Sequence, residues 1–338
     1  MTTLVRRMLT ALVFAVLLAG SGCPKRTPPA PPPTKGPTPS TPTPGAAGAG
    51  GVVLAYSVSA LSHQFFVDMM AGVEEEAKKE GATLLRADAG ANAGKQLSDV
   101  EDLLQKSPQV MLITPQDSDA IKPAVEACNK KGIPVVIIDI GASGGKVDSF
   151  IISDNLQGGR LAGECIAKHV PQGAKVAHIQ CQLGAANARK RGEGFTAAMQ
   201  AAGVQVIPPQ PADSMRDKAM TVMENLLEAN PEIAAVFCEN DPMAVGATIA
   251  AKGAGRLRGM TVVGFNGDPE ALDAIRKGEM AATVMQFPYD MGVAGVQEAA
   301  KLARGEKAQA QVNVPVELVT RDNIDRFAGY RRKTADAK

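Results

Sequence analysis

Several classes of protein are excluded by what this 338-residue sequence lacks. It contains no Trp, nine Phe, three Tyr and three His, and its formal net charge is only +1. No basic cluster accompanies that charge, so nothing favours a nucleic-acid partner. His169 and Cys165 share a helix face at four-residue spacing, but two ligands without a third are more often core packing than a metal site. We therefore expect no nucleic acid, no metal and no cofactor.

The hydrophobic run nearest the N-terminus is too short to cross a bilayer as a helix. This run, MLTALVFAVLLAG, has thirteen residues and follows Arg6 and Arg7, an arrangement typical of an export signal. The segment LAGSGC after it is similar to a bacterial lipobox, in which Cys23 is lipidated, and cleavage after Ser21 by the ordinary signal peptidase is the alternative. We interpret residues 1–23 as a signal peptide that delivers a membrane-tethered lipoprotein to the periplasm or cell surface.

The next segment, residues 24–50, contains ten Pro and almost no apolar bulk. Such a composition cannot bury enough surface to fold, so it predicts a disordered tether. About 280 residues remain, which is long for one core and suits two domains. Residues 331–338 are interpreted as a tail.

Short β-branched runs alternate with helical patterns such as GEGFTAAMQAAG from residue 51 onward, as they do in parallel βαβ units. Runs that are apolar on both faces indicate strands buried on both sides. The sequence therefore predicts an α/β protein with two doubly wound parallel sheets in tandem. The expected strands are 51–59, 82–88, 109–115, 133–139 and 148–154 in the first sheet, and 174–181, 204–211, 233–240, 260–266 and 280–286 in the second.

Polar residues stand at the carboxyl ends of these strands, where doubly wound sheets bind their ligands. Some of them are also suitable helix N-caps, so a capping role is the alternative for any single residue. Their recurrence predicts a shared cleft. The residues are Ser59, Ser62, His63, Asp139, Ser153, Asp154, Asn155, Glu239, Asn240, Asp241, Asn266, Asp268 and Gln286.

Two further patterns give weaker hypotheses. GASGG fits the G-x-S-x-G pattern of a serine hydrolase around Ser143, but a strand rather than a helix is expected next, so a turn is favoured. Export permits disulfides, and Cys181 and Cys238 end strands that would be neighbours in the second sheet, so a bond between them is a hypothesis. Cys128 and Cys165 are expected to stay buried and unpaired.

Several segments resemble, in order and spacing, the ribose-binding group of periplasmic substrate-binding proteins, which serve sugar ABC transporters. The resemblance implies a type I periplasmic binding protein, with two Rossmann-like lobes joined by a three-crossing hinge near Asn155, Phe287 and Pro315. The implied lobes are 51–153 plus 288–314 and 154–287 plus 315–330. The segments include FFVDMMAGVEEEAKKEGA, TPQDSDAIKPAVEACNKKGIPVVIID, ISDNLQGGRLAGE, RGEGFTAAM, FCENDPMAVGA, VVGFNGDPE and FPYDMG.

The resemblance also implies a ligand site between the lobes, in which Phe65 and Phe66 would stack on the apolar face of a sugar. Charged and amide groups would bind its hydroxyls, and bonds to Asp139 and Arg191 should contribute most. For Arg191 the alternative is a surface ion pair with Glu193. The implied residues are Ser59, Phe65, Phe66, Asp139, Ser153, Asn155, Arg191, Asn240, Phe265 and Gln286.

Four positions of the site depart from the ribose binders. His63, Ile140, Ser214 and Asn266 stand where that group carries Asn, Arg, Phe and a second Asp, respectively. Loss of the Arg fork and of one aromatic face predicts a ligand other than ribose, such as a larger pyranose, a deoxysugar or a polyol.

The expected function is capture of a sugar or polyol by a monomeric, non-enzymatic receptor, which delivers it to the permease and ATPase of an ABC importer. The alternatives are a sensor that presents its closed form to a chemoreceptor or kinase, and a serine hydrolase built on Ser143.

Overall fold

The computed structural model describes residues 51–327 and Tyr330. The interpreted signal peptide, Cys23, the tether and the tail 331–338 lie outside the described residues. Within the described part of the chain, no helix is both long and apolar enough to cross a membrane.

The first lobe is a six-stranded parallel sheet with its helices. Its strands are β1 (Val53–Val58), β2 (Thr83–Asp88), β3 (Val110–Ile113), β4 (Val135–Ile138), β5 (Ser149–Ser153) and β12 (Gln311–Val314), in the spatial order β12-β5-β4-β3-β1-β2. Its helices are α1 (Gln64–Lys79), α2 (Ala93–Gln105), α3 (Lys122–Lys130) and α9 (Pro288–Ala303).

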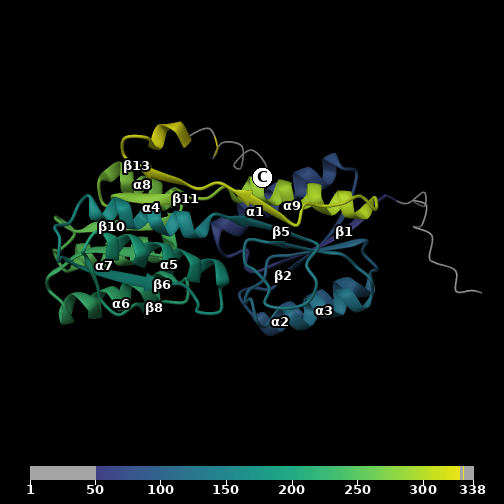
Figure 1. Cartoon of the computed structure of the whole chain (residues 1–338), viewed down its shortest axis with the longest axis horizontal. Coiled ribbons are helices and arrows are strands. Elements are labelled where there is room, and N and C mark those ends of the chain that lie inside the picture. The colour runs from purple at the N-terminus through teal and green to yellow at the C-terminus, as the bar shows by residue number, and fades with distance from the viewer. Residues whose placement is uncertain (1–50, 328–329, 331–338) are drawn as a thin grey trace, which may run out of the picture. The chain divides into compact units, whose positions relative to one another are not determined.

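The second lobe is built on a larger sheet. Its strands are β6 (Lys175–Gln180), β7 (Gln205–Val206), β8 (Gln210–Pro211), β9 (Ile233–Cys238), β10 (Thr261–Asn266), β11 (Ala282–Met285) and β13 (Glu317–Thr320). The order is β13-β11-β10-β9-β6-β7, with β8 paired to β6 and β13 antiparallel to β11. Its helices are α4 (Asn155–Ala167), α5 (Ala186–Ala201), α6 (Arg216–Ala229), α7 (Asp241–Gly253) and α8 (Pro269–Lys277), followed by the 3₁₀ helix η1 (Ile324–Phe327). Figure 1 shows α4 to α8 gathered around this sheet and α1, α2, α3 and α9 around the first.

The strands form where the sequence is apolar on both faces. All four residues of β3 and of β4 are buried, as expected for central strands covered by helices on both sides. The expected strand 204–211 is wrong as a single element, because it is interrupted between β7 and β8. Pro208 and Pro209 lie in that gap, and proline has no N–H to donate to a ladder.

Glycines let the helices of each lobe approach closely. A Cβ on Gly72 of α1 would collide with the carbonyl of Tyr289 in α9, and one on Gly292 of α9 would collide with the carbonyl of Met69 in α1. In the second lobe, Gly159 of α4 lies equally close to the carbonyl of Arg191 in α5. This contact fixes the position of α5, the helix that carries the predicted ligand residue Arg191.

The chain crosses between the two sheets three times: from β5 to α4, from β11 to α9, and from β12 to β13. The predicted fold class, two doubly wound lobes with a three-crossing hinge, is therefore confirmed. Strands β12 and β13 were not among the expected strands; they flank Pro315, the position expected for the third crossing.

Candidate functional site

A cavity of about 420 Å³, called here the central cavity, lies between the carboxyl ends of the strands of both lobes. Eleven of the fourteen predicted ligand residues line it. They are Ser59, His63, Phe65, Phe66, Asp139, Ile140, Arg191, Ser214, Asn240, Asn266 and Gln286.

The two charged groups of the predicted site come from different lobes. Asp139 follows β4 in the first lobe and is 2% exposed, and Arg191 lies on α5 in the second lobe and is 5% exposed. Burial raises the pKa of Asp139 above its ordinary value, while the charge of Arg191 and a hydrogen bond from Asn187 oppose that shift. A ligand in the cavity would therefore meet a carboxyl and a guanidinium group that are both shielded from water.

Arg191 is held by three hydrogen bonds. Its Nε donates to Asn155 Oδ1 at 2.9 Å, its Nη1 to the Glu239 carbonyl at 2.8 Å, and its Nη2 to Gln286 Oε1 at 3.3 Å. The alternative of a surface ion pair with Glu193 is wrong, because Glu193 pairs with Lys190 and Arg191 is buried.

Three predicted residues lie behind the cavity wall rather than on it. Asn155 and Phe265 support Arg191, whose Cζ lies 4.0 Å from the centre of the Phe265 ring. Ser153 is buried and donates a hydrogen bond to the Met291 sulfur. That these three contact the ligand stays a prediction; the structure places them outside the cavity lining, with Asn155 and Phe265 in contact with Arg191.

The aromatic pair forms one wall of the cavity at the start of α1. The rings of Phe65 and Phe66 lie edge to face, with centroids 5.3 Å apart and an interplanar angle of 80°. Phe65 packs into the core of the first lobe, and Phe66 is only partly buried. His63 makes a similar edge contact with Phe66, and burial lowers its pKa below the ordinary value, which favours the neutral imidazole.

Sequence reasoning missed four polar residues of the cavity wall: Gln116, Gln182, Asn187 and Asp213. Asn187 lies one helical turn before Arg191. Because residues four apart lie on the same face of a helix, the position of Arg191 predicts that Asn187 also faces the cavity. Gln116 follows the end of β3 and accepts a hydrogen bond from Ser59, so the strand-end rule applied to β3 would have found it. Gln182 accepts a hydrogen bond from Ser214.

The lobes contact each other directly beside the central cavity. The Ser118 N–H donates to the Gly184 carbonyl at 3.1 Å, and the Ala186 N–H donates to Ser118 Oγ at 3.2 Å. Asn187 Nδ2 of the second lobe also donates to Asp139 Oδ1 of the first at 3.1 Å. This side of the site is therefore closed by hydrogen bonds between the lobes.

The hypothesised bond between Cys181 and Cys238 is contradicted, because both thiols are free and buried. Their strands β6 and β9 are neighbours as expected, but the register pairs Cys238 with Ile179, two residues before Cys181. The two side chains are therefore diagonal rather than directly opposed. Cys128 and Cys165 are also buried and free, as expected.

Ser143 does not have the surroundings of a hydrolase nucleophile. It is exposed and absent from the wall of the central cavity, and the next regular element is strand β5. A nucleophile elbow requires a helix there. The turn interpretation therefore agrees with the structure.

Comparison with known proteins decides the family. A family model described as Periplasmic binding protein domain matches residues 54–307. The chain belongs to this family. The Ribose import binding protein RbsB of Escherichia coli (strain K12) is 44% identical over 268 residues, which are 79% of this chain and 90% of that protein. The protein of the same name from Bacillus subtilis (strain 168) is 43% identical over 264 residues, covering 78% and 86%.

A solved myo-inositol binding protein has the same architecture. The crystal structure of Caulobacter myo-inositol binding protein bound to myo-inositol matches with a TM-score of 0.79 at 30% identity, covering 84% of this chain and 98% of that one. The predicted family resemblance is confirmed. The chain is a periplasmic binding protein similar to ribose import binding proteins, and the relatives named here are described as binding proteins rather than as enzymes.

Proposed function

We propose that the chain binds a sugar or polyol other than ribose in the central cavity and delivers it to an ABC importer. The observation that carries this proposal is the pairing of an aromatic wall, Phe65 and Phe66, with buried charged groups on both lobes, Asp139 and Arg191. A ring with an apolar face and hydroxyl edges matches that arrangement. Hydrogen bonds from hydroxyls to charged groups contribute about 1.5–3 kcal/mol each.

The four residues that differ from those of the ribose binders lie in the wall of the central cavity, where they can change which ligand is bound. His63, Ile140, Ser214 and Asn266 all line the central cavity. Ile140 is 3% exposed and offers no hydrogen-bonding side chain, and His63 is favoured in its neutral form. The names of the similar proteins include both a ribose binder and a myo-inositol binder, which supports testing rings of both kinds.

The proposal is tested by a thermal-shift screen of the purified protein after bound ligand has been removed by unfolding and refolding. The panel contains ribose, other pentoses, hexoses, deoxysugars and polyols. A ligand at about a hundred times its Kd should add about 2.7 kcal/mol to the free energy of unfolding and raise the melting temperature. A selective hit other than ribose supports the proposal, tight binding of ribose contradicts the choice of ligand, and silence across the panel contradicts sugar binding.

We also propose that the protein acts on the importer from a lipid anchor at Cys23 and as a monomer. Uptake of the radiolabelled ligand should fail in cells that lack the chain. Chemotaxis that is lost while uptake persists would instead favour the sensor.

A further inference from the structure

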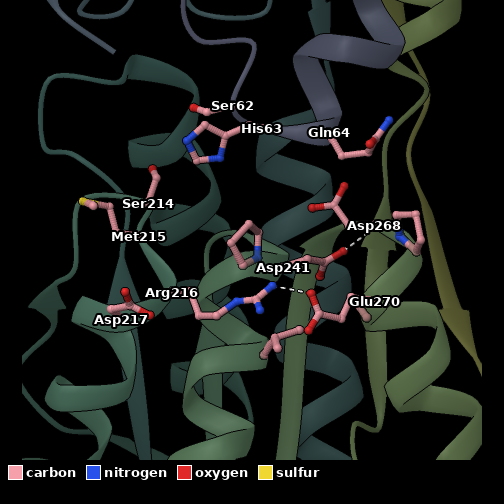
Figure 2. Close-up of a pocket in the computed structure, with 14 residues that line it drawn as sticks. Ser62, His63, Gln64, Ser214, Met215, Arg216, Asp217, Asp241, Asp268 and Glu270 are labelled. Atoms are coloured by element: carbon pink, nitrogen blue, oxygen red, sulfur yellow. Dashed lines mark hydrogen bonds and ion pairs between the residues drawn. The ribbon is translucent and has the colours of Figure 1, made fainter. Parts of the chain in front are cut away.

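A second cavity, called here the outer cavity, adjoins the central one. It has a volume of about 530 Å³ and lies between the loop before α1 and the N-terminal ends of α6, α7 and α8 (Figure 2). The two cavities share four lining residues, Ser62, His63, Ser214 and Met215, so they adjoin at these residues. Each volume alone is within the range of about 300–1,000 Å³ that is typical of small-molecule sites.

The outer cavity offers a mixed surface of the kind that holds a ring with an apolar face. Met215, Pro242 and Val245 supply apolar surface, and Gln64 and Arg216 supply polar groups. Met215 is 49% exposed, which is unusual here for so large an apolar side chain. A second ring placed in this cavity would cover that surface.

The charges of the outer cavity select against an anion. Its walls carry the carboxyl groups of Asp217, Asp241, Asp268 and Glu270, and one guanidinium group, that of Arg216, which pairs with Glu270. Figure 2 shows this ion pair at the base of the cavity. A phosphate or uronate in the same space would be repelled, because Asp217, Asp241 and Glu270 already place carboxyl groups in the first turns of α6, α7 and α8, where the helix N-termini would otherwise attract an anion.

We propose that the natural ligand has two units: a sugar or polyol ring in the central cavity, and an uncharged second unit, such as a second sugar, in the outer cavity. This inference rests on the proposed function, because it assumes that the first unit binds beside Asp139 and Arg191. A single small ring in the central cavity would leave the outer cavity unfilled. The ligand class is therefore a neutral glycoside of disaccharide size.

The test compares matched pairs of compounds by calorimetry on the purified protein. The pairs are myo-inositol with galactosyl-myo-inositol, ribose with uridine, and glucose with cellobiose. In at least one pair the compound with two units should bind about tenfold more tightly or better, since the second unit adds buried contacts without a second association penalty. Ribose 5-phosphate should bind no more tightly than ribose.

A variant that fills the outer cavity tests whether the second unit of the ligand binds there. Gln64 lines the outer cavity and not the central one, and its Nε2 donates to Asp68 at 2.7 Å. Gln64→Trp should abolish the gain from the second unit and leave the affinity for the single ring within about threefold. Gln64→Ala is the control, because it loses the same hydrogen bond without adding bulk, and it should keep most of the gain. If Gln64→Trp does not fold, Asp217→Trp at an exposed position of the same cavity replaces it.

The outcomes separate the two proposals. If single rings bind but no compound with two units binds more tightly, the inference is overturned and the proposed function stands. A gain that survives the Trp substitution used, Gln64→Trp or its replacement Asp217→Trp, would place the second unit elsewhere and would also overturn the inference. If none of the six compounds binds and the wider sugar panel is silent, the proposed function fails and the inference fails with it.

Discussion

Gly184 of the second lobe lies so close to Asp117 of the first that a Cβ at position 184 would overlap the carboxylate oxygen Oδ2. The Asp117 side chain has little freedom to move away, because its Oδ1 accepts hydrogen bonds from the Asp119 and Ala120 N–H groups at 2.9 and 2.8 Å. The adjacent Ser118 N–H donates to the Gly184 carbonyl. This contact between the lobes therefore requires glycine.

Gly184→Ala should weaken ligand binding without unfolding either lobe. The added methyl group opposes this contact between the lobes, and a forced overlap of this kind costs about 1–3 kcal/mol, which corresponds to about 5- to 150-fold in affinity. Gly253→Ala is the control, because a Cβ added there would have no atom within 4 Å, and its affinity should be unchanged. Calorimetry of both variants makes the measurement. Equal affinities for the two would show that the lobes bind ligand without this contact.

Asp139→Asn should stabilise the unliganded protein and weaken ligand binding. Burial raises the pKa of Asp139, which means that the folded state disfavours its charged form. Asn keeps the shape and also tolerates the positive φ of 67° at this position. Each kcal/mol gained should raise the melting temperature by about 2–4 °C, and loss of the charged hydrogen bonds should reduce affinity about tenfold or more. Asp273→Asn, at an exposed residue, should change neither quantity.

The difference in stability between the parent protein and Asp139→Asn should depend on pH, because the pKa of Asp139 is raised in the folded state. A carboxyl group whose folded-state pKa is raised favours folding while it is protonated, and this contribution is lost as pH rises through the raised pKa. The melting temperatures of the parent and Asp139→Asn should therefore be closest below the ordinary pKa of 3.8 and separate as pH increases. A difference that shrinks with rising pH would mean that attraction to Arg191 outweighs burial.

The strand-end residues could be predicted because the geometry of parallel sheets is simple. Asp139, Asn240 and Gln286 follow buried strands, and all three line the central cavity. Whether a predicted residue lines the cavity or lies behind its wall was not predictable, since that depends on which other side chain lies between the residue and the cavity. Asn155 and Phe265 are covered by Arg191, a relation between α4, β10 and α5 that no local pattern encodes.

Arg191→Lys should reduce affinity even though the charge is retained. Lysine lacks the planar fork, so it cannot reproduce the bonds to Asn155, Glu239 and Gln286 or the stacking on Phe265. We expect affinity to fall about 10- to 100-fold, equivalent to about 1.5–3 kcal/mol. Arg189→Lys is the control, because Arg189 is on the same helix but exposed and outside the central cavity. Unchanged affinity in Arg191→Lys would show that the ligand does not use the guanidinium group.

The four described cysteines should all be free thiols, although an exported protein passes through an oxidising compartment. Burial, followed by the charge of Glu239, raises the pKa of Cys181 to about 12, so little thiolate is available for oxidation at neutral pH. The diagonal register of Cys181 and Cys238 also disfavours the short Cβ separation that a disulfide needs. Alkylation in denaturant without reductant, followed by intact mass, should label all four. Two unlabelled cysteines that become reactive only after reduction would mean that β6 and β9 shift far enough to bring the two thiols together.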